Sequence, residues 1–497
     1  MWRDSFLKRR KRYLYLLKDT GIYYDTALRC LKISDSEGTE SSEDEKVIAD
    51  VSTCVLAPVM NAYMIWVLKA ALKKKINRLY FLARDGYFMY TTAKMICERS
   101  GIPVECRYLS CSRYSIRIPM FHFNMSEALD YITRGGIDVT LDKVLNRAGL
   151  EESDKADIIQ DIGNEFGEGV IPYADLSKLR TRLEMSEAFI TAVKSHSEKA
   201  FPAARDYLEQ EGLFEDVNYA FVDSGWTGSM QKVIGQLLDR CGHAKKLHGF
   251  YWGLYELPPD VNADDYECFY FGPSFGVRRK VEFSNCLFES IFSAPHGMTI
   301  GYQKNGKRVV PVYADIREKN KIFNEITGKY LERFTGELSK AAFGDNKPAE
   351  FPDTKKPLCS LGRYRFVNKN MSFIENLKNP EKKDVIGSLL GTFMGKPARH
   401  EAFVYGSLPF SDDVLDENEQ PVAAEMTAEE LFTNHPLKKI MILTGFSKDV
   451  IRESAWYEGS AVRNGEDTDK HLSAYRTYKW LLYGKKEAVR IKARVSR

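Results

Sequence analysis

Residues 223–230, with the sequence DSGWTGSM, hold the groups best suited to chemistry in this chain. The apolar run 218–222 precedes them, and apolar residues at helical spacing follow them. A turn that leads from a strand into a helix presents unpaired backbone N–H groups and the positive end of a helix dipole, which together suit a phosphate monoester. At the end of the strand, Asp223 is placed to accept hydrogen bonds from sugar hydroxyls. We therefore expect a phosphorylated sugar to be bound by Asp223, Ser224, Gly225, Thr227, Gly228, Ser229 and Met230.

A second polar turn, Arg84-Asp85-Gly86, follows the apolar run 77–83. Because the carboxyl ends of parallel strands meet at one edge of a sheet, we expect Arg84 to face the same crevice as residues 223–230. Gly86 permits a close backbone approach or a left-handed turn. Asp85 supplies a carboxylate that could serve as a metal ligand or as a base.

Two arginines and an isolated acid complete the set of candidates. Arg113 and Arg117 follow the next strand, 103–110, and arginine binds oxyanions through planar, bidentate hydrogen bonds. Glu289 lies among apolar residues in 287–297, a setting that raises the pKa of a carboxyl group and suits a general base. An anion-binding turn opposite a group of cations predicts a substrate with phosphates at both ends.

Each of these features also has a purely structural interpretation. A hydroxyl in 227–229 could cap the following helix, Arg84 and Asp85 could pair at the start of the next helix, and Glu289 could cap an adjacent loop. The other two arginines could be ordinary surface residues. Common catalytic motifs are missing from the sequence, which has no Walker loop, GxSxG elbow, HExxH motif or CxxC pair.

The elements that must position these residues follow from the hydrophobic spacing. A short apolar run, a stretch of helical spacing and another strand-like run form the β-α-β unit of a parallel sheet. The charged segment 125–215 has apolar residues at helical spacing and no strong strand run, so we expect a helical insertion over the sheet. From about 310 onward the chain is predicted to be helical. The predicted strands are 77–83, 103–110, 218–222 and 246–255, and a helix over 47–75 is predicted before them.

These elements predict an α/β fold in three parts. Residues 1–46 form a basic N-terminal arm and an acidic linker, 47–305 form the α/β domain with its insertion, and 306–497 form a mostly helical C-terminal region with a basic tail. No stretch approaches about 18 consecutive apolar residues, so we expect no transmembrane helix. Nine scattered cysteines are typical of reduced thiols in a cytoplasmic protein.

Basic residues are concentrated at the two ends of the chain. Residues 1–19 hold seven Lys or Arg and two acids, and residues 474–497 hold eight and one, whereas the net charge of the whole chain is +3. Both ends carry aromatic residues, including Trp2 and Trp480. An acidic body with two such ends is typical of a protein that contacts an anionic membrane, although basic helical ends are commonly just solvated. No nucleic-acid partner is expected, because zinc fingers and RNP-type aromatic motifs are absent.

Four sequence motifs within about 47–305 carry a family resemblance. They are FLARDGYFMY (81–90), YLSCSRYSIR (108–117), FVDSGWTGSMQ (221–231) and FESIFSAPHG (288–297). Their sequences resemble the glycan phosphoribosyltransferase domain of bacterial ribofuranosyltransferases. Proteins of that family assemble O-antigen and capsule polysaccharides and are often labelled haloacid-dehalogenase-like hydrolases. The order of strands and loops also resembles the type I phosphoribosyltransferase fold.

The resemblance implies a phosphoribosyltransferase-like core that uses phosphoribosyl pyrophosphate as donor. The acceptor would be a sugar hydroxyl of a lipid-linked glycan at the cytoplasmic face of the bacterial membrane, with the helical insertion on the acceptor side. Residues 227–230 would hold the 5-phosphate, Asp223 would orient the ribose, and Asp85 would share a Mg²⁺ ion with the phosphates. Asp85 is the first candidate for the base and Glu289 the second. The pyrophosphate would be bound by Arg84, Gly86, Arg113 and Arg117.

The chain departs from the family pattern at two points. The family commonly carries a phosphatase domain with an Asp-x-Asp motif after a strand, but the only such motif here, at 467–469, lies in a polar stretch. A separate phosphatase would then remove the 5-phosphate. The adjacent acid pair of ordinary phosphoribosyltransferases is here Asp223-Ser224. Two alternatives stay open: a haloacid-dehalogenase-like phosphohydrolase with Asp85 or Asp223 as nucleophile, and a non-catalytic phosphoribosyl-binding protein of the same fold.

Overall fold

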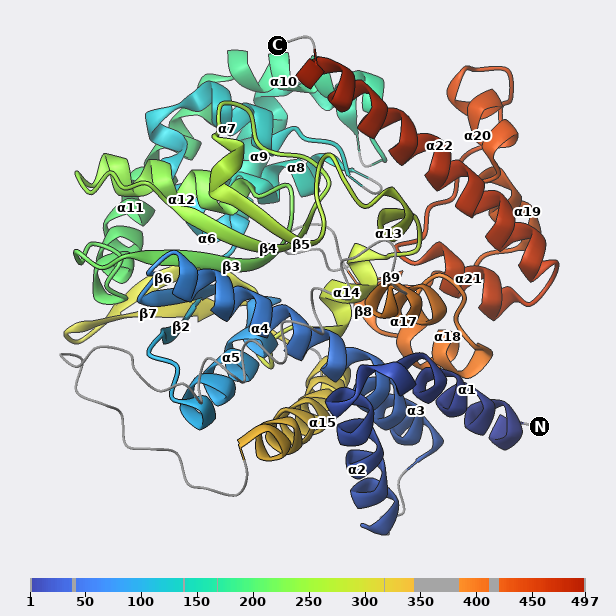
Figure 1. Cartoon of the computed structure of the whole chain (residues 1–497). Coiled ribbons are helices and arrows are strands. Elements are labelled where there is room, and N and C mark those ends of the chain that lie inside the picture. The colour runs from blue at the N-terminus through green and yellow to red at the C-terminus, as the bar shows by residue number, and fades with distance from the viewer. Residues whose placement is uncertain are drawn as a thin grey trace.

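A computed structural model describes seven stretches of the chain, and a five-stranded, all-parallel sheet lies at its centre (Figure 1). Their bounds are 2–37, 42–136, 139–167, 169–316, 318–343, 384–410 and 420–495. The α/β class predicted from the sequence is confirmed. The strands follow the order β2-β1-β3-β4-β5 and comprise Arg78–Leu82 (β1), Glu105–Leu109 (β2), Tyr219–Trp226 (β3), His248–Leu254 (β4) and Tyr266–Phe271 (β5).

Both faces of the sheet are covered, and the side chains of β1 show how. Leu79 and Phe81 point into the larger apolar core, whereas Tyr80 and Leu82 point into a second core on the opposite face. Successive side chains of a strand alternate between the two faces, so a strand buried on both sides is apolar throughout. This explains why the run at 77–83 could be recognised as a strand from its composition.

Helices cover the two faces of the sheet (Figure 1). On the first face, α5 (Gly86–Ser100) packs on β1, β2 and β3, and α4 (Ala57–Lys73) and α15 (Glu318–Phe343) pack on α5. On the second face, apolar side chains of α12 (Ser229–Arg240) and α11 (Glu187–Gln210) share the core with Tyr80 and Leu82. The hairpin of β6 (Thr299–Asn305) and β7 (Arg308–Tyr313) packs on α11.

The strand order reverses between β1 and β3. The chain passes from β1 to β2 on one side and later returns to place β3 on the other side of β1. The connections that leave the carboxyl ends of β1 and β3 therefore diverge to opposite faces, and a crevice opens between them. Residues 83–86 and 223–230, which the sequence analysis singled out, lie at this point.

The segment 125–215, predicted to be helical, contains α7 to α11 and has an apolar core of its own. That core is built from residues such as Leu129, Leu145 and Leu179 and is separate from the two cores beside the sheet. A short helix, α6 (Arg113–Arg117), and the 3-10 turns 118–123 lead into it from β2. The helices of the segment are α7 (Met125–Ile132), α8 (Leu141–Arg147), α9 (Glu152–Ile162), α10 (Leu176–Met185) and α11.

The N-terminal residues are part of the main core rather than an arm. Helices α1 (Trp2–Leu17) and α2 (Ile22–Ser36) bury Leu16, Leu17 and Tyr23 in the same apolar core as α4 and α5. Much of the acidic stretch predicted as a linker is helical, since helix α3 (Glu43–Val51) begins within it and is capped by a Ser42 capping box. Residues 38–41 of that stretch lie outside the described residues. An amphipathic helix needs a partner for its apolar stripe, and here that partner is the core.

One continuous helical run, Glu43–Lys73, is long and apolar enough to cross a membrane by length and composition alone. It comprises α3, the five-residue π-helical turn Ser52–Leu56 and α4. In the structure 94% of its apolar window is buried inside the protein. It is thus the central helix of the core, in agreement with the helix predicted over 47–75.

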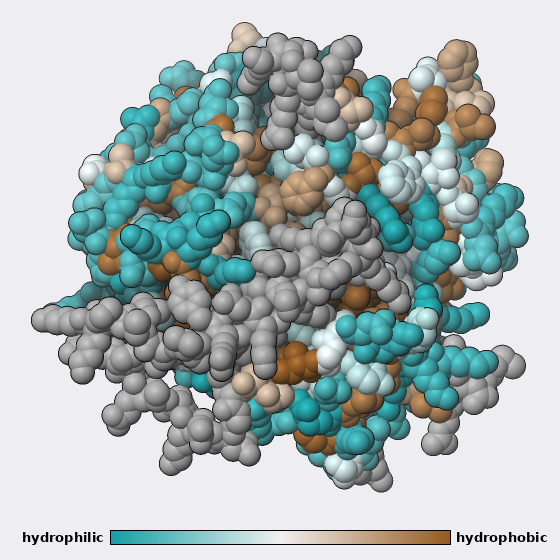
Figure 2. All heavy atoms as spheres, viewed as in Figure 1, coloured by the Kyte–Doolittle hydropathy of each residue, from teal (hydrophilic) through white to brown (hydrophobic). Residues whose placement is uncertain are grey.

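The region after β5 differs from the prediction near its start. Residues 299–313 form the β6–β7 hairpin, although the sequence analysis expected helix from about 310 and a boundary at 305. Further on the chain is helical, and Figure 2 shows apolar side chains gathered in the upper right, over α19 and α20. The helices are α17 (Val385–Phe393), α18 (Arg399–Gly406), α19 (Ala428–Thr433), α20 (Pro436–Leu443), α21 (Tyr457–Asn464) and α22 (Thr468–Val495), with a small β8–β9 pair (Pro409–Phe410, Gln420–Pro421) between α18 and α19.

Candidate functional site

A cavity of about 370 Å³ opens at the carboxyl ends of β1, β2 and β3. It lies where the strand order reverses, which is where ligands bind in open α/β sheets. The turns after β1 and β2, the end of β3 and the start of α12, and the helix α14 (Asn285–Ile291) each contribute to its wall. Of the predicted site residues, those that line the cavity are Arg84, Asp85, Arg113, Asp223, Ser224, Gly225, Thr227, Ser229, Met230 and Glu289.

Three carboxylates project into this cavity from three elements. Asp85 accepts a hydrogen bond from the Ser224 hydroxyl, and Glu289 accepts one from the indole N–H of Trp226. The Ser224 backbone N–H donates to Asp223 Oδ1 at 2.9 Å. In the described part of the chain these hydrogen bonds come from a hydroxyl, an indole and a backbone amide, and none comes from an arginine. The acids are thus oriented without an arginine hydrogen bond in the described structure, and the charges of Arg84 and Arg113 compensate them only in part.

Burial and mutual repulsion raise the pKa values of these acids. Burial, with a further contribution from the Asp85 charge, raises the pKa of Asp223 to about 7 and that of Glu289 to about 7. Burial also raises the pKa of Asp85, although the Ser224 hydrogen bond and the nearby Arg84 and Arg113 oppose the shift. Carboxyl groups with pKa values near neutrality exchange protons readily at physiological pH, as general acids and bases must.

Four arginines also line the cavity. Arg84 and Arg113 are exposed to solvent at the mouth, and Arg134 and Arg147 come from the helical insertion. Arg147 is 1% exposed, and its guanidinium donates to the carbonyls of Ile132, at 3.1 Å, and Arg134. The peptide bond between Ala83 and Arg84 is cis. A planar guanidinium matches the geometry of phosphate oxygens, so these side chains are suited to an anion.

The turn between β3 and α12 supplies further donors to the cavity. Gly225 has a φ of +109°, and a Cβ built there would lie 2.7 Å from the Gly253 carbonyl oxygen, so only glycine fits. Gly228 is left-handed (φ +63°) at the start of α12, and no side chain caps that end of the helix in the described structure. The first N–H groups of α12 therefore remain available to an anion beside the hydroxyls of Thr227 and Ser229.

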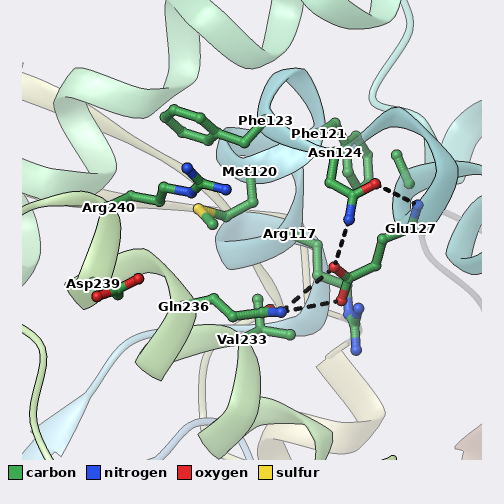
Figure 3. A pocket seen from close by; sticks show the side chains of 11 residues that line it. Arg117, Met120, Phe121, Phe123, Asn124, Glu127, Val233, Gln236, Asp239 and Arg240 are labelled. Atoms are coloured by element: carbon green, nitrogen blue, oxygen red, sulfur yellow. Dashed lines mark hydrogen bonds between the residues drawn. The ribbon is translucent and has the colours of Figure 1, made fainter. Parts of the chain in front are cut away.

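Three predicted site residues do not line the cavity. Gly86 lies against β1, where a Cβ would be 3.0 Å from the Phe81 carbonyl carbon, so its role is to let α5 pack closely on the strand. Gly228 shapes the turn without reaching the wall. Arg117 lines a separate pocket of about 140 Å³ between α7 and α12 (Figure 3). Its guanidinium there lies over the ring of Tyr131. The structure thus does not bring Arg117 to the predicted pyrophosphate site.

A divalent cation would need ligands from this same set of acids. Among the described residues no group of three or more His, Cys, Asp or Glu side chains is arranged to hold a metal ion. Mg²⁺ commonly takes only one or two protein carboxylates and completes its shell with phosphate oxygens and water. Asp85 and Asp223 repel one another across the cavity, so a cation shared between their carboxylates and a phosphorylated substrate would relieve that repulsion. The donor set therefore fits Mg²⁺ held jointly with a ligand.

Sequence reasoning missed several wall residues. Arg134 and Arg147 come from the insertion, and the Trp226 indole orients Glu289 from within the 223–230 turn itself. The only sequence signal near Arg134 is the glycine pair that follows it at 135–136, which marks a sharp turn. Nothing in the spacing of Arg147, within a helix of the insertion, indicates that it reaches the sheet edge.

No protein-family model matches this chain, and no curated protein is significantly similar to it.

Proposed function

We propose that the protein is a glycan phosphoribosyltransferase, which transfers 5-phosphoribosyl from phosphoribosyl pyrophosphate to a sugar hydroxyl of a bacterial surface polysaccharide and releases pyrophosphate. The observation that supports this most is the division of one cavity between donors for anions and oriented acids. The start of α12 and four arginines line the same cavity as Asp223, which lies at the end of β3, and these donors suit two anionic groups on one ligand. A pentose with a phosphate on one end and a pyrophosphate on the other matches that division.

Each part of the donor has a proposed partner. The 5-phosphate binds the N–H groups at the start of α12 and the hydroxyls of Thr227 and Ser229. Asp223 accepts hydrogen bonds from the ribose hydroxyls. Arg84 and Arg113 bind the pyrophosphate, and Arg134 and Arg147 add positive potential on that side. Mg²⁺, when bound by Asp85 and the phosphates, supplies further charge neutralisation.

In the reaction the acceptor oxygen forms a bond to C1 of the ribose while the bond from C1 to the pyrophosphate oxygen breaks. The electron pair of that bond leaves with the pyrophosphate, and the proton of the acceptor hydroxyl passes to a carboxylate. Catalysis is then mainly a matter of positioning and of stabilising the charge on the leaving group. Of the two candidate bases, Glu289 suits the proton transfer better, because its pKa is raised to about 7.

The acceptor would approach along the helical insertion. A second cavity, of about 420 Å³, shares Gly135 with the first and lies between 136–176 and residues 430 and 450–453. Its wall mixes apolar side chains such as Val170 and Tyr173 with Glu430, Arg452 and Glu453. Such a mixture suits a sugar chain, which presents both apolar faces and hydroxyls. A separate phosphatase would act on the product, since the only Asp-x-Asp motif of the sequence, 467–469, lies at the start of α22 and follows a helix, not a strand.

The experiment that tests the proposal measures donor binding and turnover together. Purified protein is titrated calorimetrically with phosphoribosyl pyrophosphate in the presence of Mg²⁺, and pyrophosphate release is followed with synthetic glycans as acceptors. The variant Asp223→Asn should lower affinity or turnover at least ten-fold, because a charged acceptor for the ribose hydroxyls is lost. The matched control, Asp239→Asn, changes an acid of the separate pocket in Figure 3 and should behave as the wild type.

The outcomes separate the three candidate functions. Release of pyrophosphate together with a mass gain on the acceptor supports the transferase. Release of phosphate from simple phosphomonoesters without an acceptor supports the phosphohydrolase instead. Donor binding without any turnover supports a binding protein, and no heat of binding at all would refute the proposal.

A further inference from the structure

The strongest feature outside the cavity is a group of exposed apolar side chains on 432–450, which we name the hairpin surface. It comprises α20, the end of α19 and the turn that follows α20. Seven of the 21 large apolar side chains that are exposed in the described structure lie in these 19 residues. They are Phe432, Leu437, Ile440, Met441, Leu443, Phe446 and Val450, with Leu437 78% and Phe446 83% exposed.

Helix α20 buries a lysine and exposes apolar side chains, which is the reverse of an ordinary surface helix. Its only buried side chain is Lys439, whose ammonium donates to Asn434 Oδ1 at 3.2 Å and lies 3.7 Å from Glu453. Leu437, Ile440 and Leu443 of the same helix meanwhile face solvent, and Ile442 is half-exposed. Helices of globular proteins normally bury the apolar stripe and expose the lysines. A fold that satisfies a buried lysine while it exposes Leu437, Ile440 and Leu443 has positioned that apolar face for something outside the molecule.

The surroundings of the hairpin surface indicate what covers it. Helix α22 packs against α20 and exposes Trp480, Leu481 and Val489 together with Lys485 and Lys486. Apolar side chains beside lysines and a tryptophan are the composition of helices that lie in a membrane interface, where lysines meet anionic headgroups. Figure 1 shows α20 projecting at the edge of the molecule, so it can reach a flat surface.

We infer that the hairpin surface inserts into the interface of an anionic membrane, with α22 lying against the headgroups. This deepens the proposed function and rests on it for its purpose, since a lipid-linked acceptor is found at such a surface. Val450 belongs to the hairpin surface and also lines the second cavity, so docking would bring the mouth of that cavity to the bilayer.

In the N-terminal basic run, by contrast, two of the five cations are engaged within the protein, whereas Lys8, Lys11 and Arg12 are exposed. Arg9 pairs with Glu401 at 2.8 Å, and Arg10 pairs with Asp50 at 2.7 Å. Arginines held in this way cannot also bind headgroups without breaking those pairs. Helix α1 exposes only Leu7 and Tyr15 among its described large apolar side chains, so α20 and α22 together present the larger apolar surface for a membrane contact.

The test measures sedimentation of the full-length protein with vesicles, without any substrate. Vesicles of phosphatidylcholine with 30% phosphatidylglycerol are compared with vesicles of phosphatidylcholine alone. The variant Leu443→Ser/Phe446→Ser should lower the partition coefficient at least ten-fold, because two apolar side chains no longer enter the interface. The control Ile322→Ser alters an apolar side chain of α15 that is 49% exposed, and it should bind as the wild type does.

A second variant tests the charge contribution separately. Lys485→Gln/Lys486→Gln should lower binding to the anionic vesicles by about five-fold for each lysine and leave binding to neutral vesicles unchanged. Circular dichroism and thermal unfolding verify that each variant is folded. Wild-type binding by Leu443→Ser/Phe446→Ser, or no vesicle binding by the wild type, overturns the inference. If light scattering finds the wild type dimeric, and Leu443→Ser/Phe446→Ser loses the dimer but keeps vesicle binding, the inference is overturned and the hairpin surface is assigned to a second copy of the chain.

This test also distinguishes failure of the inference from failure of the proposed function. The variant Leu443→Ser/Phe446→Ser should release pyrophosphate at the wild-type rate with a soluble acceptor. Vesicle binding without transferase activity would leave the membrane contact standing and refute the activity, whereas activity without vesicle binding would do the reverse.

Discussion

Buried or half-buried acids occur in two regions of this molecule, and they are compensated differently. In the N-terminal core, Glu401 is fully buried and accepts hydrogen bonds from the Arg9 guanidinium, the Tyr13 hydroxyl and the Ala398 backbone N–H. In the cavity, Asp223 and Glu289 accept hydrogen bonds only from uncharged donors in the described structure, and their pKa values are raised to about 7.

The difference shows how a structural charge can be told from a functional one. An acid that stabilises the fold has a positively charged partner within the protein, because an unpaired buried charge lowers the stability of the folded state. An acid that serves a ligand is oriented but left short of positive charge, and the fold bears the cost until the ligand arrives. The sequence alone does not reveal this distinction. The cations of the Lys8–Arg12 run and the arginines Arg84 and Arg113 are all positively charged there, and nothing indicates which of them pair within the protein.

The largest effect should come from breaking the structural pair. Arg9→Met leaves Glu401 buried without its cation, and we expect the free energy of unfolding to fall by about 3–5 kcal/mol. Arg84→Met, at the cavity mouth, should change it by no more than about 0.5 kcal/mol, since Arg84 is exposed. Urea unfolding of both variants checks this. Equal losses from the two substitutions would contradict the comparison.

The second prediction concerns the reaction rate, which should depend on an arginine of the cavity. Arg84→Ala should lower the rate of pyrophosphate release at least ten-fold, because loss of one charge at a leaving group costs about 3 kcal/mol. Arg205→Ala, which removes a surface ion pair with Asp206, should retain the wild-type rate. Stopped-flow or coupled assays at saturating donor concentration measure the rate of pyrophosphate release in both variants. Wild-type turnover in Arg84→Ala would assign that arginine a structural role.

Much of the site could be predicted because strand ends converge. Asp85 and Asp223 each follow an apolar run, and a parallel sheet brings the ends of such runs to one edge. The insertion could not be placed in this way, because the docking of its helices depends on side-chain packing and not on spacing. Arg134 and Arg147 were therefore missed.

Two errors have local causes. Arg117 is one helical turn beyond Arg113, yet the aromatic ring of Tyr131 holds it in another pocket, a contact between distant residues that spacing does not reveal. The β6–β7 hairpin could have been found, because Asn305-Gly306 is a strong turn signal between two strands and Gly306 has a φ of +60°. The apolar run 308–313 was instead attributed to the helical region that follows.

The smallest predicted effect concerns the stability cost of the cavity acids. The folded pKa of Asp223, about 7, lies above its ordinary value of 3.8, so the folded state binds the proton more tightly than the unfolded state does. The stability that this group contributes is complete below about pH 4 and is lost as the pH rises toward 7. Asp223→Asn removes that dependence.

Urea unfolding of Asp223→Asn and wild type at several pH values tests this sign. The variant should be more stable than the wild type by on the order of 1 kcal/mol at pH 8, and the advantage should vanish near pH 4. Because Asp223 is partly exposed, the effect is smaller than the pKa shift alone would suggest. A variant less stable at pH 8 would mean that Asp223, like Glu401, is a structural acid, and the distinction between the two regions would fail.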